Sequence, residues 1–367
     1  MTFVKFTDLG KQYLILREEI LAKFDEISKQ GDYILSDEVL KFENNFAEYC
    51  GARFAVGVGN GSDALYLSLM SLGVGSGDEV ITAPNSFIAS ASVIARTGGT
   101  IVFADVGYDM NIDPDRVEKT ITKRTKAILP VHISGRVADM ESLQAIADKY
   151  NLFIVEDAAQ AVGARYKGKR AGTFGVSAGF SLHPLKNLHV HGDGGVITTN
   201  EDTLYKRLLK YRNHGLRNRD ECDFWGVNSR LDSIQAGIAN IKLKYLDRWN
   251  ERFREIASFY SANLRDYVSV PEYHDYEEPV FHRYMIQCSK RDELKNFLAR
   301  NGVETKVNYP IPIHLQKAAK ALGYKKGDFP VVEKLSDSIL SLPIYPEMED
   351  EHTCYVIDKI IEYYKKI

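Results

Sequence analysis

The chain has 367 residues, of which 44% are hydrophobic, 47 are basic and 50 are acidic, for a formal net charge of -3. This composition supports a large core and favours two domains. Because the charges are interleaved, neither nucleic acid nor an anionic membrane is indicated as a partner. The four scattered cysteines lack metal-binding spacing, and no apolar run approaches the roughly 20 residues of a membrane span. We therefore expect a cytoplasmic protein.

Short apolar runs alternate with segments of helical spacing from about residue 52 to residue 200. Continuous apolar strands separated by helices are typical of a mostly parallel sheet that is covered on both faces. Ligands of such sheets bind beyond the carboxyl ends of the strands. The strands are expected at residues 54–58, 80–83, 101–104, 127–131 and 153–155.

Longer helical patterns follow residue 200, at 204–212 and 233–254, and a strand-like run occupies residues 281–287. This change of pattern predicts a large α/β domain over residues 1–245, with an N-terminal helical arm, and a smaller α+β domain over residues 246–367.

The glycine-rich run Gly57–Leu65 follows the first predicted strand and opens a helix. The N-H groups near Gly61, Ser62 and Asp63 would face an anion there. The spacing is GxGxG, which is neither the dinucleotide fingerprint nor a P-loop and favours a single phosphate. Taken alone, this run is at least as well explained by a tight strand-helix turn. A dinucleotide enzyme would also require an acidic ribose partner on the following strand.

Asp157 ends the last predicted strand of this region, where a carboxylate is costly unless it is paired. Its alternative role is to cap the next helix. Lys186 lies in a loop between strand-like runs, in a glycine-rich region, and Ser181 precedes it by five residues. A lone lysine is normally a solvated surface group. Together with the phosphate turn, these residues predict a pyridoxal phosphate (PLP) site, in which a lysine forms a Schiff base and a carboxylate keeps the ring nitrogen protonated.

Other side chains near these motifs are open to two readings. Phe87 follows the second predicted strand and could stack on a flat cofactor or pack in the core. His183, His189 and His191 lie within nine residues, but no carboxylate or cysteine completes a zinc pattern, so we expect no metal site.

The whole chain resembles the DegT/DnrJ/EryC1/StrS family of PLP-dependent sugar aminotransferases, within the aspartate aminotransferase superfamily. This resemblance implies the fold-type I architecture, with a mostly parallel seven-stranded sheet between helices and a smaller C-terminal α+β domain. The motifs that carry it, besides those above, are Phe6–Tyr13, Tyr33–Val39, Pro130–Gly135, Asn228–Ala236, Tyr309–Gln316 and Ser341–Pro346.

The resemblance also implies roles for individual residues. Lys186 would form the Schiff base and shuttle protons, Asp157 would pair with the ring nitrogen, and Gln160 would lie near the phenolic oxygen of the cofactor. The phosphate would be held by Gly61, Ser62, Asp63 and Ser181, and the ring would be stacked by Phe87. Asn228 would reach the phosphate of a neighbouring subunit, which implies a homodimer with shared sites. Tyr309 and His314 match a segment near the sugar nucleotide, and His183 and His191 could line the mouth of the site.

The implied reaction moves an amino group from L-glutamate to a nucleotide-linked keto sugar, with pyridoxamine phosphate as the intermediate form of the cofactor. The residues around Lys186 and Leu243–Arg252 are more similar to members that act at C3 than to those that act at C4. Alternatives are a PLP-dependent dehydratase, an aminotransferase for a cyclitol or another keto sugar, and a non-catalytic regulator that binds sugar nucleotides. The unusual stretches Leu182–Pro184 and His189–His191 bear on the substrate more than on the reaction.

Overall fold

The computed structural model describes residues 2–366 and is built around a seven-stranded sheet. β9 pairs antiparallel with both β1 and β8, and the other strands pair in parallel. The mostly parallel seven-stranded sheet expected from the sequence is confirmed. In spatial order the strands are β1 (Phe54–Val58), β9 (Gly195–Thr199), β8 (Ser177–Ser181), β5 (Phe153–Asp157), β4 (Thr125–Leu129), β2 (Glu79–Thr82) and β3 (Thr100–Phe103).

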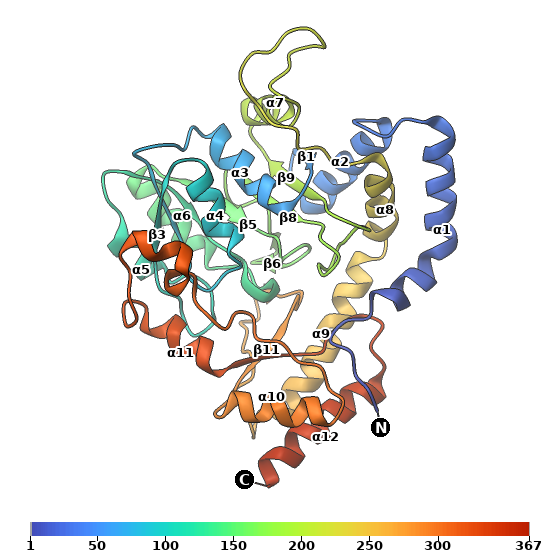
Figure 1. Cartoon of the computed structure of the whole chain (residues 1–367), viewed down its shortest axis with the longest axis vertical. Helices are drawn as coiled ribbons and strands as arrows, with labels where there is room; N and C mark the ends of the chain where they lie inside the picture. Colours follow the sequence, from blue (N-terminus) through green and yellow to red (C-terminus); the bar gives the residue numbers. More distant parts are fainter. Residues whose placement is uncertain (1, 367) are drawn as a thin grey trace.

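Helices cover both faces of this sheet (Figure 1). The strands are buried on both sides, and Val80, Ile81 and Ile128 are fully buried in the main core, which is why their sequences are apolar without alternation. The helices of this part are α1 (Leu9–Gln30), α2 (Asp37–Cys50), α3 (Gly61–Ser71), α4 (Ala89–Arg96), α5 (Pro114–Thr120), α6 (Met140–Tyr150), α7 (Asp202–Tyr211) and α8 (Ser233–Leu243).

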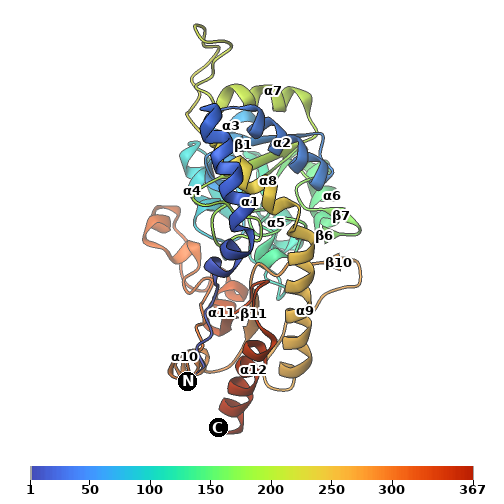
Figure 2. The same ribbon diagram turned by 90° about the vertical axis from the view of Figure 1, so that its right-hand side faces the viewer.

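A second core lies at the end of the molecule that carries both chain termini (Figure 2). Tyr260 and Tyr284 are fully buried in it. It is formed mainly by α9 (Leu246–Leu264), β11 (Tyr284–Gln287), α10 (Arg291–Arg300), β12 (Ile339–Leu342) and α12 (Asp350–Lys365), while α11 (Pro330–Ser338) packs on the main core. Shorter elements are β6 (Arg165–Tyr166), β7 (Lys169–Arg170), β10 (Glu277–Glu278) and the 3-10 helices η1 (Ile133–Gly135), η2 (Ile313–Leu315) and η3 (Lys317–Leu322).

The single helix expected over residues 233–254 is wrong in detail, because the chain breaks at Lys244 and Tyr245. α8 packs against α1 and α2, whereas α9 continues into the second core, and one straight helix could not serve both surfaces. The domain division at residue 246 stays a prediction, although α9 begins there. Among residues 2–366, no helix is both long enough and apolar enough to cross a bilayer.

Candidate active site

Asp157 lies buried at the carboxyl end of β5, in the middle of the sheet. Ser90 Oγ, from α4, donates a hydrogen bond of 2.6 Å to its Oδ2, and the backbone N-H of Ala159 donates one of 3.2 Å to its Oδ1. Burial raises the pKa of Asp157, while the Ser90 and Ala159 hydrogen bonds and the nearby Lys186 act in the opposite direction. The carboxylate therefore has room for one more cationic donor.

Lys186 lies in the loop between β8 and β9, at the end of a turn in which its N-H donates to the carbonyl of His183 at 2.8 Å. A ring nitrogen of the buried His189 contacts the Lys186 carbonyl at 2.9 Å, and this contact stabilises the turn. Burial lowers the pKa of Lys186 to about 8; Asp157 raises it and Arg283 lowers it. A substantial fraction of the amine is then neutral near physiological pH, as a nucleophile or a proton acceptor requires.

A small anion site is formed where α3 begins. Asn60 caps the helix by accepting from the Asp63 N-H at 2.8 Å. A Cβ on Gly61 would lie 2.7 Å from Ser181 Cβ, and one on Gly195 would lie 2.4 Å from the Asn60 carbonyl. Glycines are therefore required for β8, β9 and the turn to come this close. The helix N-terminus, the half-buried Ser62 and the Ser181 hydroxyl meet at this point, as expected for a phosphate.

Asp63 is in this turn, but its polar groups are already engaged. Its carboxylate accepts from Ser229 at 2.8 Å, from Asn60 at 3.2 Å and from Arg96 at 3.0 Å, and its N-H is held by Asn60. The structure thus gives Asp63 the task of fixing the turn and its neighbours, rather than leaving a free group for the anion.

Two more predicted residues lie beside the strand ends. Phe87 follows β2 with 53% of its surface exposed, and its ring centroid is 5.8 Å from that of Tyr309. An exposed aromatic face at this position is available for a flat ligand. Gln160 is buried and accepts from the Ser134 N-H at 2.8 Å through its Oε1, which leaves its amide N-H groups for another partner.

The three histidines predicted to lie near the substrate occupy different environments. His183 and His191 are exposed; a His183 ring nitrogen accepts from the Leu185 N-H at 3.2 Å, and the His191 ring lies 5.8 Å from that of Tyr13. His314 is buried against Glu333 and Phe329, and it does not line the cavities beside Lys186 or Arg283. Within residues 2–366, histidine, cysteine and carboxylate side chains form no group of three suited to a metal.

His132, which follows the carboxyl end of β4, is turned into the core. It is fully buried, and its Nε2 is 2.9 Å from Glu156 Oε2. Glu156 also accepts from three backbone N-H groups, at Gly172, Phe174 and Gly175. Since every donor and acceptor is satisfied within the core, this pair supports the strand behind Asp157.

Asn228 adjoins the phosphate turn, because the neighbouring Ser229 accepts from the Gly59 N-H at 3.0 Å and donates to Asp63 at 2.8 Å. It is exposed and lies at the base of a hairpin, residues 212–230, that rises beyond α7 in Figure 1. The hairpin is internally bonded, for example by Arg217 and Asp223 at 2.6 Å, and Trp225 on it is 93% exposed. Within one chain, Asn228 is not brought to Lys186.

Sequence reasoning missed Ser90 and Arg283. Ser90 is one of several serines in a helix, and its link to Asp157 spans 67 positions of the chain. Arg283 lies within an ordinary strand-like run, and only the folded chain brings it to Lys186. No local signal in either segment would have identified these contacts.

The gathered residues fit PLP. The absence of a Cβ on Gly61 lets the start of α3 pack directly against Ser181, so that the helix N-terminus and the Ser181 hydroxyl lie side by side. Asp157 lies buried with capacity for a ring N-H, and Lys186 offers an amine whose pKa is about 8. Phe87 and Gln160 lie at the strand ends between these groups.

Comparison with known proteins agrees with this geometry. The chain is 45% identical to a protein of Geobacillus stearothermophilus named "Pleiotropic regulatory protein", over 99% of each chain. It is 42% identical to the dTDP-3-amino-3,6-dideoxy-alpha-D-galactopyranose transaminase of Aneurinibacillus thermoaerophilus, over 98% of this chain and 99% of the relative. The crystal structure of DesV from S. venezuelae, in complex with a ketimine intermediate, matches all of both chains with a TM-score of 0.98 and 41% identity, which confirms the fold class. The family model for the DegT/DnrJ/EryC1/StrS aminotransferases matches residues 14–361, and the chain belongs to this family.

Proposed function

We propose that the chain is a PLP-dependent aminotransferase that moves the amino group of L-glutamate to a keto sugar carried by a nucleotide. The observation that carries this proposal is that Lys186, an amine with a pKa of about 8, lies close enough to the buried Asp157 for each charge to affect the pKa of the other. PLP, when bound, supplies an electron sink for the carbon from which a proton is removed.

Most of the site residues bind the cofactor, and one of them, Lys186, transfers a proton. Asp157 holds the ring nitrogen and is itself held by Ser90. Gly61, Ser62 and Ser181 bind the phosphate, Phe87 covers the ring and Gln160 orients its phenolic oxygen. With the cofactor bound, Lys186 Nζ would take the proton from the carbon that bears the amine and deliver it to C4' of the cofactor, which a neutral amine can do.

C3 of the sugar is the favoured position for the new amine. Relatives at 42% and 41% identity are named dTDP-3-amino sugar transaminases, and one at 36% is named a UDP-2-acetamido-2-deoxy-3-oxo-D-glucuronate aminotransferase. A relative at 37% is named GDP-perosamine synthase, so related chains differ in both nucleotide and sugar. His183, His191, Tyr309 and His314 are proposed to shape the substrate site.

The active form is proposed to be a cytoplasmic homodimer. The hairpin that carries Asn228 is bonded within itself, and its tip rises away from the rest of the chain, as expected if it enters a neighbouring subunit. All four cysteines are free thiols, which fits a reducing compartment.

The test is incubation of the purified protein with L-glutamate and a panel of nucleotide-linked 3-keto and 4-keto sugars. We expect 2-oxoglutarate and amino sugar in equal amounts, with a preference for a 3-keto substrate. Lys186→Arg should abolish both products, and the matched control Lys167→Arg, at an exposed lysine paired with Glu141, should retain them. Amino sugar formed by Lys186→Arg at the wild-type rate would overturn the proposal.

A regulator without catalysis is the second candidate, and it is favoured by the name of the 45% identical relative. Lys186 and Asp157 count against it, because a regulator has no need of an amine with a lowered pKa beside a buried carboxylate. Binding of a sugar nucleotide without product, together with no cofactor absorbance sensitive to borohydride, would favour the regulator.

A further inference from the structure

Arg283, which lines a small cavity together with Lys186, has no acidic partner in the described part of the chain. Among residues 2–366, no carboxylate lies within ion-pair distance of it, and its described hydrogen bond, 2.9 Å long, runs to the adjacent carbonyl of His282. By contrast, four arginines whose side chains are 8 to 18% exposed each contact a carboxylate: Arg136 with Glu277, Arg170 with Asp247, Arg212 with Glu43 and Arg291 with Asp292. A guanidinium carries five N-H donors, so most of those of Arg283 remain for a ligand.

The position of Arg283 is fixed by its surroundings. It precedes β11 and lies 5.1 Å from the Phe6 ring centroid, a cation-π contact that supports the charge without neutralising it. It lines a small cavity together with Lys186, and it also lines a cleft of about 1020 Å³. Asp8 and Glu347 line the small cavity as well, but neither forms an ion pair with Arg283.

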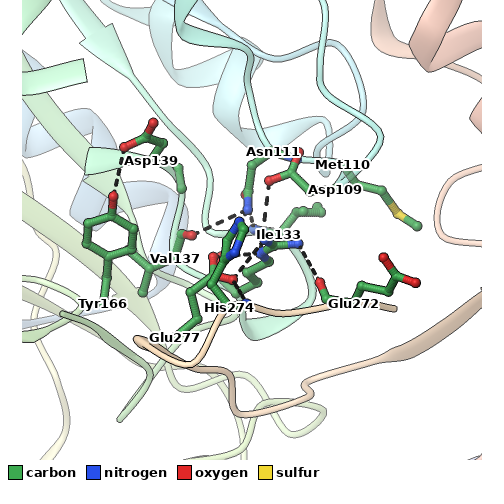
Figure 3. A network of polar contacts seen from close by, with 12 residues as sticks. Asp109, Met110, Asn111, Ile133, Val137, Asp139, Tyr166, Glu272, His274 and Glu277 are labelled. Carbon is green, nitrogen blue, oxygen red and sulfur yellow. Dashed lines mark hydrogen bonds and ion pairs between the residues drawn. The ribbon is translucent and has the colours of Figure 1, made fainter. Parts of the chain in front are cut away.

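One wall of the larger cleft is itself held rigidly. Arg136 binds both carboxylate oxygens of Glu277 at 2.9 Å and the carbonyl of Glu272 at 3.1 Å, which ties this segment to the end of β4. Figure 3 shows Glu272 and Glu277 facing Asp109 and Asn111 in this network. The carboxylates of Glu277 and Asp109 are thus paired with Arg136, whereas Arg283, which lines a cavity with the reacting lysine, pairs with no carboxylate among residues 2–366.

The proposed reaction indicates which anion the guanidinium of Arg283 binds. In an amino acid, the α-carboxylate is one bond away from the carbon whose amine must reach Lys186. In a nucleotide-linked 3-keto sugar, the nearest phosphate is several bonds from the keto carbon. The cofactor phosphate belongs to the cradle at Gly61 and Ser181, which is made by the large sheet. An anion held beside Lys186 therefore matches the amino acid substrate best.

We propose that Arg283 binds the α-carboxylate of the amino donor. This assignment rests on the proposed aminotransferase function. A guanidinium offers two parallel N-H groups to a carboxylate, and such charge-assisted pairs are stronger than neutral hydrogen bonds. When the keto acid leaves, the Phe6 ring still supports the side chain, and the same N-H groups can donate to hydroxyls of the incoming sugar. The residue would therefore matter more for the donor half of the reaction than for the sugar half.

The experiment measures the two half-reactions separately, one with the amino donor and one with the amino sugar. Conversion of the PLP form by L-glutamate, and by the amino-sugar nucleotide that the enzyme produces, is followed by absorbance in single-turnover mixing. Arg283→Gln should raise the glutamate concentration for half-maximal rate by about 10- to 100-fold and change that for the amino sugar by less than about threefold. The matched control, Arg265→Gln, alters an exposed arginine of the larger cleft that does not line the small cavity and should leave both values unchanged.

Two further measurements test whether Arg283 binds the α-carboxylate of the donor. Isoglutamine, which carries an amide in place of the α-carboxylate, should be a much poorer donor than glutamate for the wild type but not for Arg283→Gln. Binding of maleate, measured by calorimetry without turnover, should weaken in Arg283→Gln and recover in part in Arg283→Lys. An unchanged glutamate dependence, or equal loss of both halves, would overturn the role of Arg283 while leaving the proposed function standing. Failure of the wild-type enzyme with every donor would instead count against the function itself.

Discussion

Ser90 Oγ donates a hydrogen bond of 2.6 Å to Oδ2 of Asp157, so a serine on α4 supports the charge of a carboxylate at the end of β5. Ser90→Ala removes this donor, and we expect the pKa of Asp157 to rise further, since burial already raises it. Loss of a hydrogen bond to a buried carboxylate should weaken PLP affinity about tenfold, and more at lower pH, where the carboxyl is more often protonated. Absorbance titration of the apoprotein with PLP at two pH values measures this.

Ser92 provides the control, because it lies on the exposed side of the same helix and donates only to the Ala89 carbonyl. Ser92→Ala should bind PLP as the wild type does. Equal affinity of Ser90→Ala and Ser92→Ala would show that the contact with Asp157 has no role in binding.

The close approach of Gly61 to Ser181 predicts a steric effect on the phosphate site. A Cβ at position 61 would lie 2.7 Å from Ser181 Cβ, so Gly61→Ala must push α3 or β8 away. Overpacking of this kind costs about 1–3 kcal/mol, and we expect PLP affinity to fall at least about fivefold. Pyridoxal, which lacks the phosphate, should lose less. In the control Gly10→Ala the nearest atom to the new methyl is Asp8 Oδ1, at 3.5 Å, and neither affinity should change.

The lowered pKa of Lys186 predicts how the reactivity of its amine changes with pH. Because burial lowers this pKa to about 8, the neutral amine of the apoprotein should become half-populated near pH 8 and decline below it. Acetylation by acetic anhydride, quantified by peptide mass spectrometry, should follow that curve. Lys149 is a suitable internal reference, since its hydrogen bond to Glu118 raises its pKa above the usual value. A Lys186 profile that keeps rising alongside Lys149 would contradict the burial argument.

The burial of Lys242 on α8 should make the free energy of unfolding depend on pH. It is 1% exposed, has no ion pair within residues 2–366, and burial lowers its pKa to about 7, although Glu347 raises it. The unfolded lysine titrates near 10.5. Between these values the unfolded chain binds more protons, so this residue makes stability rise with pH. Lys242→Met should therefore stabilise the fold most at pH 7 and below, by a few kcal/mol, and the gain should fade towards pH 10.5.

Urea unfolding at pH 6.5 and pH 9.5 checks this expectation. The control Lys206→Met, at an exposed lysine of α7 paired with Asp202, should change stability by less than about 0.5 kcal/mol at either pH. If Lys242→Met destabilises the protein equally at both pH values, Lys242 has a polar partner that outweighs its burial.

The sheet could be predicted from the sequence because its strands are buried on both faces and therefore appear as continuous apolar runs. The break between α8 and α9 could not, since the helical periodicity continues through Lys244 and Tyr245. The surroundings of His132 could not be predicted from the sequence for a related reason. The end of a predicted strand shows where the backbone leaves the sheet. It does not show whether the next side chain points to the ligand or, as for His132, to Glu156.

By itself, the sequence determined the kinds of groups available: a glycine turn that can hold an anion, a carboxylate at the end of an apolar strand and a lysine in a glycine-rich loop. Only the tertiary structure decided which of them act together. Charge states and hydrogen bonds depend on distances of a few ångströms between segments far apart in the chain, as for Ser90 and Asp157 or for Arg283 and Lys186. Desolvation arises only when the surrounding side chains have packed. For this reason the amine of Lys186 and the unpaired guanidinium of Arg283 acquire their properties from the fold.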